Sequence, residues 1–178
     1  MKLRLASSVT SDSIVDGPGL RTVIWTQGCK HNCKGCHNKQ THDFCGGFEV
    51  EVEAIIDTLK DLRLQKGITL SGGDPFEQPD ALIKICKEAR KLGLDIWAYS
   101  GYTIEQLTDV KNEKYFKWKN LLNEIDVLID GKFVESKKSM LLKYRGSSNQ
   151  RILDVKKSLQ LKRAVLHVDY TEDMDIAK

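Results

Sequence analysis

The chain has 178 residues, of which 40% are hydrophobic and 30% charged, and 28 Lys and Arg against 25 Asp and Glu leave a net charge of +3. This composition is typical of one globular domain, expected over residues 1–178, and excludes disordered and collagen-like classes. The small positive excess does not indicate a nucleic-acid or membrane partner. No apolar run approaches the roughly 20 residues of a membrane span, and residues 1–12 lack a secretory signal, so we expect a cytoplasmic protein.

Predicted strands and helices alternate along the chain from residue 20 onward. Residues 20–26 are rich in β-branched and aromatic side chains, which is typical of a strand. In residues 51–64, and again in residues 80–92, apolar side chains recur at steps of three and four, which predicts two helices that each bury one face. The other expected elements are strands at 67–70, 94–99 and 125–129, a helix at 115–123 and a final strand at 164–168.

This alternation predicts right-handed βαβ units around a parallel sheet, whose ligands gather at the carboxyl ends of the strands. A closed barrel of eight such units takes about 250 residues, so the shorter chain predicts a partial, open barrel of α/β class. Polar or glycine-rich motifs follow four expected strands: the cysteine loop, Gly72-Gly73-Asp74-Pro75, Ser100-Gly101 and Asp130-Gly131-Lys132. We therefore expect these loops to form one site.

Three of the five cysteines lie within eight residues, at Cys29, Cys33 and Cys36. A tight group of cysteines in a reducing compartment indicates metal binding or catalysis rather than a disulfide framework. A [4Fe-4S] cluster usually takes four cysteines, so three leave one iron without a protein thiolate. An open metal position is what a substrate or cofactor needs in a catalytic site.

Structural zinc is the alternative, with Cys45, His31 or His37 as the fourth ligand. The spacing disfavours it, because zinc ligands generally come as two short pairs and the second pair is missing here. Cys86 lies on the apolar face of the second predicted helix, where a free cysteine acts as a small core residue. Cys45 stands outside the cluster spacing and has no assigned role.

The spacing CxxxCxxC after the first strand resembles the radical S-adenosylmethionine superfamily, in which the open iron binds the amine and carboxylate of the cofactor's methionine. The wider pattern resembles the activating enzymes of glycyl radical proteins, and most closely the branch that acts on the anaerobic ribonucleoside-triphosphate reductase. The matching segments are DGPGLR at 16–21, QGC at 27–29, CHN at 36–38, SGGDP at 71–75, SGY at 100–102 and RGSSNQR at 145–151. They cover the chain from about residue 13 to residue 152.

The resemblance implies a partial, open (βα) barrel of the radical S-adenosylmethionine type, with a [4Fe-4S] cluster and S-adenosylmethionine as cofactors. It implies reductive cleavage of the cofactor to a 5′-deoxyadenosyl radical, which generates a glycyl radical on the large reductase subunit, with a flavodoxin-like electron donor. Two alternatives remain open. One is a radical enzyme for a small molecule such as a deazapurine precursor, and the other is a non-catalytic iron-sulfur or zinc electron-transfer module.

The resemblance also assigns site residues. Cys29, Cys33 and Cys36 are the expected cluster ligands, and Asp16 and Arg21 are candidates for partner contact. The expected cofactor contacts are Gly35, Cys36, His37, Gly72, Gly73, Asp74, Ser100, Asp130 and Lys132. Gly35 stands where many members of the superfamily have an aromatic residue, so adenine contacts are expected from the 35–37 backbone and the His37 ring.

Composition alone supports simpler interpretations of several of these residues. Gly72-Gly73-Asp74-Pro75 is also a typical turn after a strand, and only the resemblance makes it the holder of the methionine amine. Ser100, Asp130 and Lys132 carry groups that bind ribose or a carboxylate, or else line a solvated loop. The 145–151 segment is a polar loop by composition.

Overall fold

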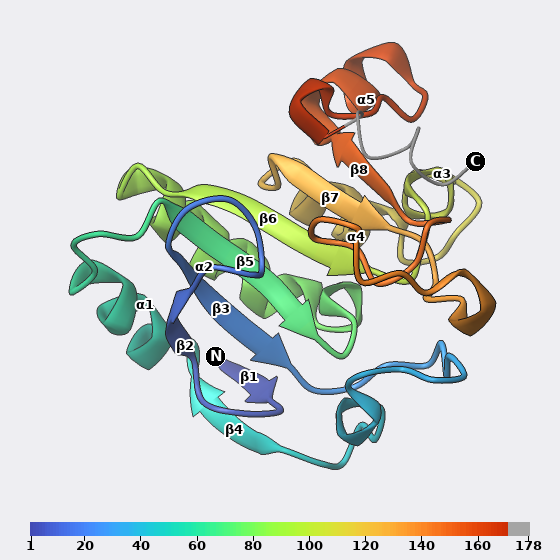
Figure 1. The fold of residues 1–178 in the computed structure, drawn as a ribbon. Helices are drawn as coiled ribbons and strands as arrows, with labels where there is room; N and C mark the ends of the chain where they lie inside the picture. The colour runs from blue at the N-terminus through green and yellow to red at the C-terminus, as the bar shows by residue number, and fades with distance from the viewer. Residues whose placement is uncertain (171–178) are drawn as a thin grey trace.

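The computed structural model describes residues 1–170, and within them one eight-stranded sheet has the order β4-β1-β3-β5-β6-β7-β8, with β2 paired to β3 (Figure 1). The strands are β1 Lys2–Leu5, β2 Thr10–Ser13, β3 Arg21–Thr26, β4 Phe48–Glu51, β5 Gly67–Gly72, β6 Asp95–Ser100, β7 Val127–Asp130 and β8 Arg151–Asp154. The two ends of this order, β4 and β8, do not pair with each other, so the sheet is open.

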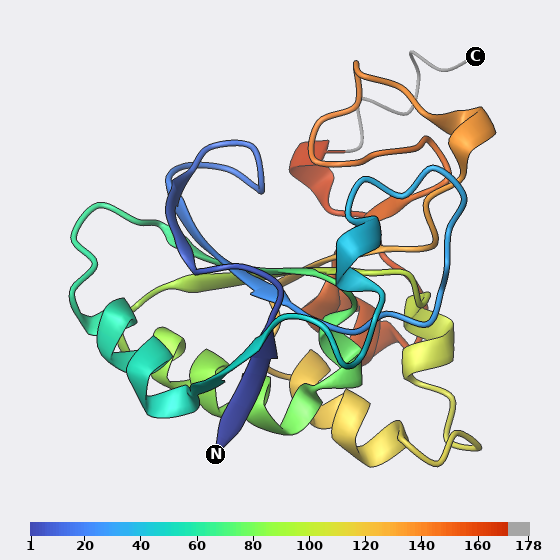
Figure 2. The same cartoon turned by 90° about the horizontal axis from the view of Figure 1, so that it is seen from below.

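The α-helices of the described chain are α1 Val52–Lys60, α2 Pro79–Lys91, α3 Ile104–Leu107, α4 Tyr115–Leu122 and α5 Val155–Leu161. Short 3-10 turns lie at Lys39–Thr41, Pro75–Glu77, Glu135–Lys137 and Val168–Tyr170. Figure 2 shows α1, α2 and α4 on one face of the sheet, while the loops at 6–20 and 132–150 lie over the opposite face. The loops that carry the expected site motifs are thus free of the helical layer.

The centre of the sheet is parallel, as the alternation predicts. β3 pairs with β5, β5 with β6 and β6 with β7, all in parallel register. These strands are buried almost throughout, which matches their runs of apolar and β-branched residues. Their carboxyl ends all reach the same edge of the sheet, beside the cysteine loop (Figure 1). The predicted open α/β class is confirmed.

The outer strands differ from the expectation of a wholly parallel sheet. β1, β2, β4 and β8 all pair in antiparallel register. β2 has the sequence TSDS and β4 the sequence FEVE, and both are largely exposed. Short edge strands of this kind bury too little apolar surface to be distinguished from loops by their pattern.

Two predicted elements need correction. The strand expected at 164–168 is wrong, because the described chain has there only an isolated bridge between Leu153 and Leu166 and the start of a 3-10 turn. The last strand is instead β8, which follows the polar loop directly. The first helix, α1, ends at Lys60 rather than at residue 64, and Leu64 is exposed.

The hydrophobic core lies between the sheet and the helices. Leu82, Ile85 and Cys86 of α2 are fully buried against it, which confirms the prediction that Cys86 is a core residue. Trp118 of α4 packs edge-on against Phe76 and donates a hydrogen bond from its indole nitrogen to the Phe76 carbonyl. This contact anchors the segment that follows β5, which carries Asp74.

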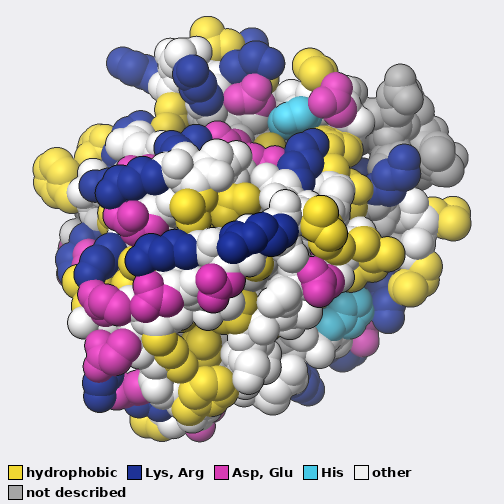
Figure 3. All heavy atoms as spheres, turned by 90° about the vertical axis from the view of Figure 1, so that its left-hand side faces the viewer, with side chains coloured by type: hydrophobic (Ala, Val, Ile, Leu, Met, Phe, Trp, Pro, Cys, Tyr) yellow, Lys and Arg dark blue, Asp and Glu magenta, His cyan; other side chains and the backbone are white. Residues whose placement is uncertain are grey.

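The surface mixes charges of both signs. Figure 3 shows Lys and Arg interspersed with Asp and Glu on the side that carries α1. Ion pairs such as Lys60 with Asp57, and Lys84 with Glu53, join opposite charges on or between the helices. None of the helices in residues 1–170 has the length and apolar character required to cross a bilayer.

Candidate active site

The three clustered cysteines lie on the loop between β3 and β4. Cys29, Cys33 and Cys36 are each partly buried and all line one cavity of about 470 Å³. The same cavity is lined by Gly72 and Gly73 at the carboxyl end of β5, Ser100 and Gly101 at the carboxyl end of β6, and Gly131 after β7. The prediction that four separate loops meet at one rim is confirmed.

Tight backbone turns hold the cysteine loop in place. Gly28, Asn32 and Gly35 have positive φ angles of 97°, 48° and 72°, and a left-handed conformation favours glycine and tolerates asparagine. The Cys36 amide donates to the Cys33 carbonyl at 3.2 Å, and the Cys29 amide donates to the His42 carbonyl at 3.2 Å. These bonds turn the cysteines towards the cavity.

Burial raises the pKa of two of the three thiols, Cys29 and Cys33. The pKa of Cys29 is raised to about 11, chiefly by burial, and a hydrogen bond from the His31 backbone opposes this rise. The pKa of Cys33 is also raised by burial, against the lowering effect of a backbone hydrogen bond from Phe133. Because metals bind the thiolate form, loading this site releases protons.

The donor set fits a cluster. The Asn38 amide donates to Cys36 Sγ at 3.4 Å, so backbone N–H groups approach all three sulfurs. Within residues 1–170, no three His, Cys, Asp or Glu side chains are grouped as ligands of a single metal ion. This arrangement is compatible with an iron-sulfur cluster, because each thiolate would bind a different iron and the three sulfurs need not converge on one metal ion. Such N–H groups around the sulfurs tune the potential of an iron-sulfur cluster.

Two glycines bring the β5 rim close to the cysteine loop. A Cβ added at Gly72, which has a φ of 99°, would lie 2.5 Å from the Thr26 carbonyl oxygen. A Cβ at Gly73 would collide with the Gly28 carbonyl, next to Cys29. The absence of side chains here lets the two loops pack backbone to backbone, and leaves room for a ligand to approach the main chain.

Comparisons with known proteins agree with this donor set. The pattern of the family described as "4Fe-4S single cluster domain" matches residues 15–153. The anaerobic ribonucleoside-triphosphate reductase-activating protein of Salmonella typhi is 41% identical over 145 residues, covering 77% of this chain and 90% of that protein. The chain belongs to this family of reductase-activating proteins.

Other relatives in the family extend the match. The protein of the same name from Pasteurella multocida is 39% identical over 78% of this chain and 90% of its own length. The one from Enterobacteria phage T4 is 34% identical over 78% of this chain and 86% of its own length. Among solved structures, QueE from Escherichia coli is similar with a TM-score of 0.44 and 14% identity, covering 57% of this chain and 54% of that chain.

The structure separates the predicted cofactor contacts of this family member into two groups. Gly72, Gly73, Ser100, Cys36 and His37 line the cavity. The others do not: Gly35 packs towards Glu135, Lys132 is exposed, and Asp74 and Asp130 are buried beneath the rim. His37 is exposed, with its ring 5.3 Å from that of Phe133.

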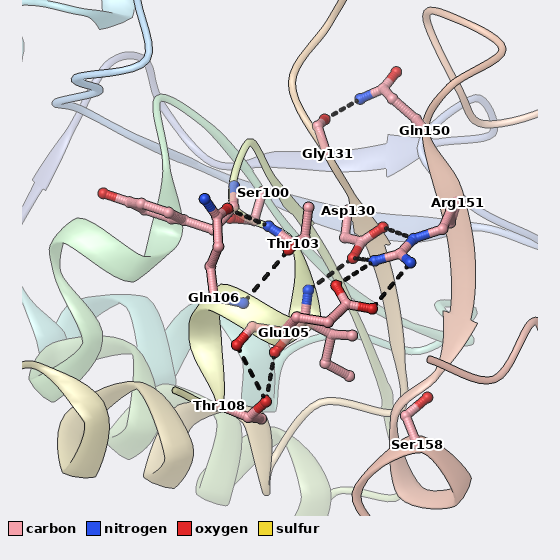
Figure 4. A network of polar contacts seen from close by, with 12 residues as sticks. Ser100, Thr103, Glu105, Gln106, Thr108, Asp130, Gly131, Gln150, Arg151 and Ser158 are labelled. Carbon is pink, nitrogen blue, oxygen red and sulfur yellow. Dashed lines mark hydrogen bonds and ion pairs between the residues drawn. The ribbon is translucent and has the colours of Figure 1, made fainter. Parts of the chain in front are cut away.

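Asp130 is engaged by its own chain. Its carboxylate accepts hydrogen bonds from the Ile104 amide at 2.8 Å and from Arg151 at 2.9 and 2.5 Å (Figure 4). Arg151 also binds Glu105 through two hydrogen bonds, of 3.1 and 2.8 Å. Asp130 therefore joins β7, α3 and β8, and acts on the cavity by holding Gly131 at its wall.

The two candidates for partner contact also differ in their surroundings. Asp16 lines the cavity and accepts a hydrogen bond from Ser13 at 2.5 Å. Arg21 is fully buried in the sheet and so is out of reach of a partner surface. Buried polar side chains of this type form hydrogen bonds within the fold, and Arg21 donates one to the Pro18 carbonyl of the preceding loop.

Sequence reasoning missed the aromatic part of the cavity wall. Trp25, Tyr99, Phe133 and Tyr144 all line it, and come from β3, β6 and the 132–150 segment. Arg145, inside a segment that was only a polar loop by composition, is buried and lines the cavity as well. Trp25 and Tyr99 could have been predicted as wall residues, because both lie near the carboxyl ends of predicted strands, where ligands bind.

Proposed function

We propose that this protein is a radical S-adenosylmethionine enzyme that generates a glycyl radical on the anaerobic ribonucleoside-triphosphate reductase. The observation that carries the proposal is one cavity lined by three cysteines and by glycine-rich rims of the neighbouring strands, in a chain that belongs to the reductase-activating family. The single domain assigned to residues 1–178 is part of the same proposal.

The chain's residues would hold the cofactors in defined places. Cys29, Cys33 and Cys36 would bind three irons of a [4Fe-4S] cluster, and leave the fourth for the methionine part of S-adenosylmethionine. The backbone carbonyls of Gly72 and Gly73 would accept hydrogen bonds from the methionine ammonium. The adenine would lie against the backbone of Cys36 and His37 and against the His37 ring, and Ser100 would face the ribose or carboxylate.

When bound, the reduced cluster would supply one electron to break a carbon–sulfur bond of S-adenosylmethionine, giving methionine and a 5′-deoxyadenosyl radical that would take a hydrogen atom from a glycine to become 5′-deoxyadenosine. The protein's contribution is to position these groups and to exclude water and oxygen. The partly buried aromatic wall suits this task, because its large rings occupy space that water would otherwise fill.

A protein substrate is supported by the mouth of the cavity. Val15 of the 6–20 loop and Met140 of the 132–150 segment both line the cavity, and are 72% and 86% exposed. Their neighbours Ile14 and Leu141 are 71% and 79% exposed. Exposed apolar residues that border a site favour contact with another protein. Asp16, beside Val15, is the polar candidate for partner contact on this rim.

The electron donor and compartment complete the proposal. A flavodoxin-like protein would supply the electron, and a cytoplasmic location would keep the three thiols reduced. The small net charge of +3 favours protein and small-molecule partners over nucleic acid or a membrane.

The test is anaerobic reconstitution of the protein with iron and sulfide, followed by reduction in the presence of S-adenosylmethionine. We expect equal amounts of methionine and 5′-deoxyadenosine. On addition of the reductase subunit, we expect a glycyl radical signal by electron paramagnetic resonance. Formation of 5′-deoxyadenosine without that signal would favour a small-molecule substrate. A colourless protein with stoichiometric zinc and no cleavage would overturn the enzyme assignment in favour of a non-catalytic module.

A further inference from the structure

The cysteine loop contains a histidine whose side chain is buried and bonds to another segment of the chain. His31 lies between Cys29 and Cys33, and only 6% of its side chain is exposed. Its Nε2 atom is 2.7 Å from Asp74 Oδ2, on the segment that follows β5. Its ring also packs edge-on against Tyr102, with 4.3 Å between ring centroids.

Asp74 joins His31 to two further segments. Its carboxylate accepts hydrogen bonds from the Phe76 amide at 3.0 Å, from Ser100 Oγ at 2.9 Å and from the Gly101 amide at 3.0 Å. With His31, these donors come from the cysteine loop, the segment after β5 and the end of β6. Asp74 is fully buried, so water does not compete for these bonds.

Four donors also occupy the carboxylate. An ionised carboxylate offers about four lone-pair directions to hydrogen-bond donors. Phe76, Ser100, Gly101 and His31 supply one donor each, all from the chain. Asp74 is also fully buried and does not line the cavity, so an ammonium group in the cavity would have to disrupt this packing to reach its carboxylate. The side chain of Asp74 therefore suits an internal anchor better than a contact to a bound amine.

The space around the His31 ring is shaped for it. A Cβ added at Gly101 would collide with His31 Cδ2, so residue 101 must lack a side chain for the ring to reach Asp74. The Tyr102 hydroxyl in turn donates to Glu77 at 2.5 Å, which fixes the aromatic ring on which His31 rests. The contact is thus supported on several sides.

We propose that His31 is a positioning residue which, through Asp74, locks the cysteine loop onto the rim of β5 and β6 before iron binds. The inference rests on the proposed function, because it takes the three cysteines as cluster ligands. Locking the loop reduces the conformational entropy that cluster binding must otherwise remove. Asp74 then acts by holding the loop, and not as a ligand of the methionine amine.

The test begins with the metal-free protein and needs neither cofactor. The amides of Cys29 and Cys36 are hydrogen-bonded within the loop, so their hydrogen exchange reports its opening. In His31→Phe, which keeps a ring but loses the polar atom, we expect both amides to exchange about tenfold faster or more. His31→Gln, which keeps a donor, should restore part of the protection. His37→Phe, in the exposed part of the same loop, should leave the Cys29 amide at its wild-type rate.

The second readout separates this role from two others. We expect His31→Phe to bind less iron than the wild type when iron is limiting. In the double variant with Asp74→Asn, the effect on the amide exchange rates should be smaller than the sum of the two single effects, because both substitutions break the same contact. A wild-type rate of amide exchange in His31→Phe would overturn the proposal. If this variant exchanged at the wild-type rate but lost iron, the result would indicate that His31 is a metal ligand. Asp74→Asn with weaker S-adenosylmethionine binding but wild-type exchange would identify Asp74 as a cofactor ligand. Failure of the proposed function would show instead as absent cofactor cleavage in the wild type, with the exchange results unaffected.

Discussion

The Arg21 guanidinium lies 2.6 Å from the Asp95 carboxylate, between Nη2 and Oδ1, at the amino ends of the parallel strands β3 and β6. Arg21 also donates from Nε to Thr69 Oγ1 at 2.8 Å and from Nη2 to the Ile68 carbonyl at 2.6 Å. The guanidinium stacks on Trp97, 5.4 Å from the ring centroid. One charged residue thereby joins three neighbouring strands of the sheet from inside.

We expect Arg21→Ala to destabilise the protein by about 3 kcal/mol, because it leaves the partners of a buried charge without their donor. Chemical denaturation of the metal-free protein measures this loss. Arg63→Ala is the control, since Arg63 is exposed and bonds only to nearby backbone carbonyls. An equal, small effect of the two substitutions would show that the Arg21 network adds little to stability.

The cysteine ligands are tested one at a time. We expect Cys29→Ala, Cys33→Ala and Cys36→Ala each to lose the iron-sulfur absorbance and the cleavage of S-adenosylmethionine, because in the proposed cluster each thiolate would bind its own iron. Cys45→Ala is the matched control, since Cys45 is exposed and lies outside the cavity lining. Full cleavage activity in any of the three variants would remove that cysteine from the ligand set.

Gly73→Ala tests the close approach of the β5 rim to the cysteine loop. Its Cβ would collide with the Gly28 carbonyl, which also accepts a hydrogen bond from the Asp74 amide at 2.9 Å. We expect a loss of about 1–3 kcal/mol in stability from this overpacking, together with reduced iron content.

Gly93→Ala is the control for this substitution. Gly93 has a φ of 78° but nothing within 4 Å of an added Cβ, and it lies at the end of α2. Alanine there costs about 1 kcal/mol through backbone strain alone, and iron content should stay at the wild-type level. Unchanged iron content in Gly73→Ala would show that the loop adapts to the extra methyl group.

The Arg151 network makes stability depend on acid pH. The hydrogen bonds from Arg151 lower the pKa of Glu105 from 4.5 to about 2 (Figure 4). Between these values the unfolded chain binds more protons than the folded one, so stability falls as the pH falls. The contribution of Glu105 is fully present above about pH 4.5 and is lost as the pH falls to about 2.

Glu105→Gln provides the measurement, since it removes the titrating group and keeps the size of the side chain. We expect the free energies of unfolding of the wild type and the variant to differ most near neutral pH. The difference should shrink as the pH falls from 4.5 towards 2. A difference that stays constant over this range would show that the charge of Glu105 does not stabilise the fold.

Most of the site was predictable because its signals are local. The cysteine spacing, the glycines after β5 and the serine after β6 each follow a strand whose apolar run is visible in the sequence. Parallel strands bring such loops to one edge, so convergence on one cavity followed from topology. The helices α1, α2 and α4 were predictable for the same reason, since their apolar residues recur with the helical period.

The roles of the charged residues depended on distant partners. Arg21, Asp74 and Asp130 occur in motifs that suggest contact with ligands or a partner, yet all three are buried against groups 21 to 74 residues away in the chain. Nothing in the flanking sequence indicates which of these charges is neutralised inside the fold. A buried charge is held by whatever folding places beside it, and only the tertiary structure supplies that neighbour.

The strands at one edge of the sheet also differ in whether the sequence alone predicts them. Residues 127–129 are apolar and predict β7 from the sequence alone, whereas β8 is recognisable only once Leu153 pairs with Leu128 across the sheet. Local patterns therefore determined the parallel centre and the family of this protein, and they supplied the candidate cluster ligands. Long-range packing decided the antiparallel edges and turned three apparent ligand-binding charges into supports of the fold, because burial and pairing are properties of the assembled chain.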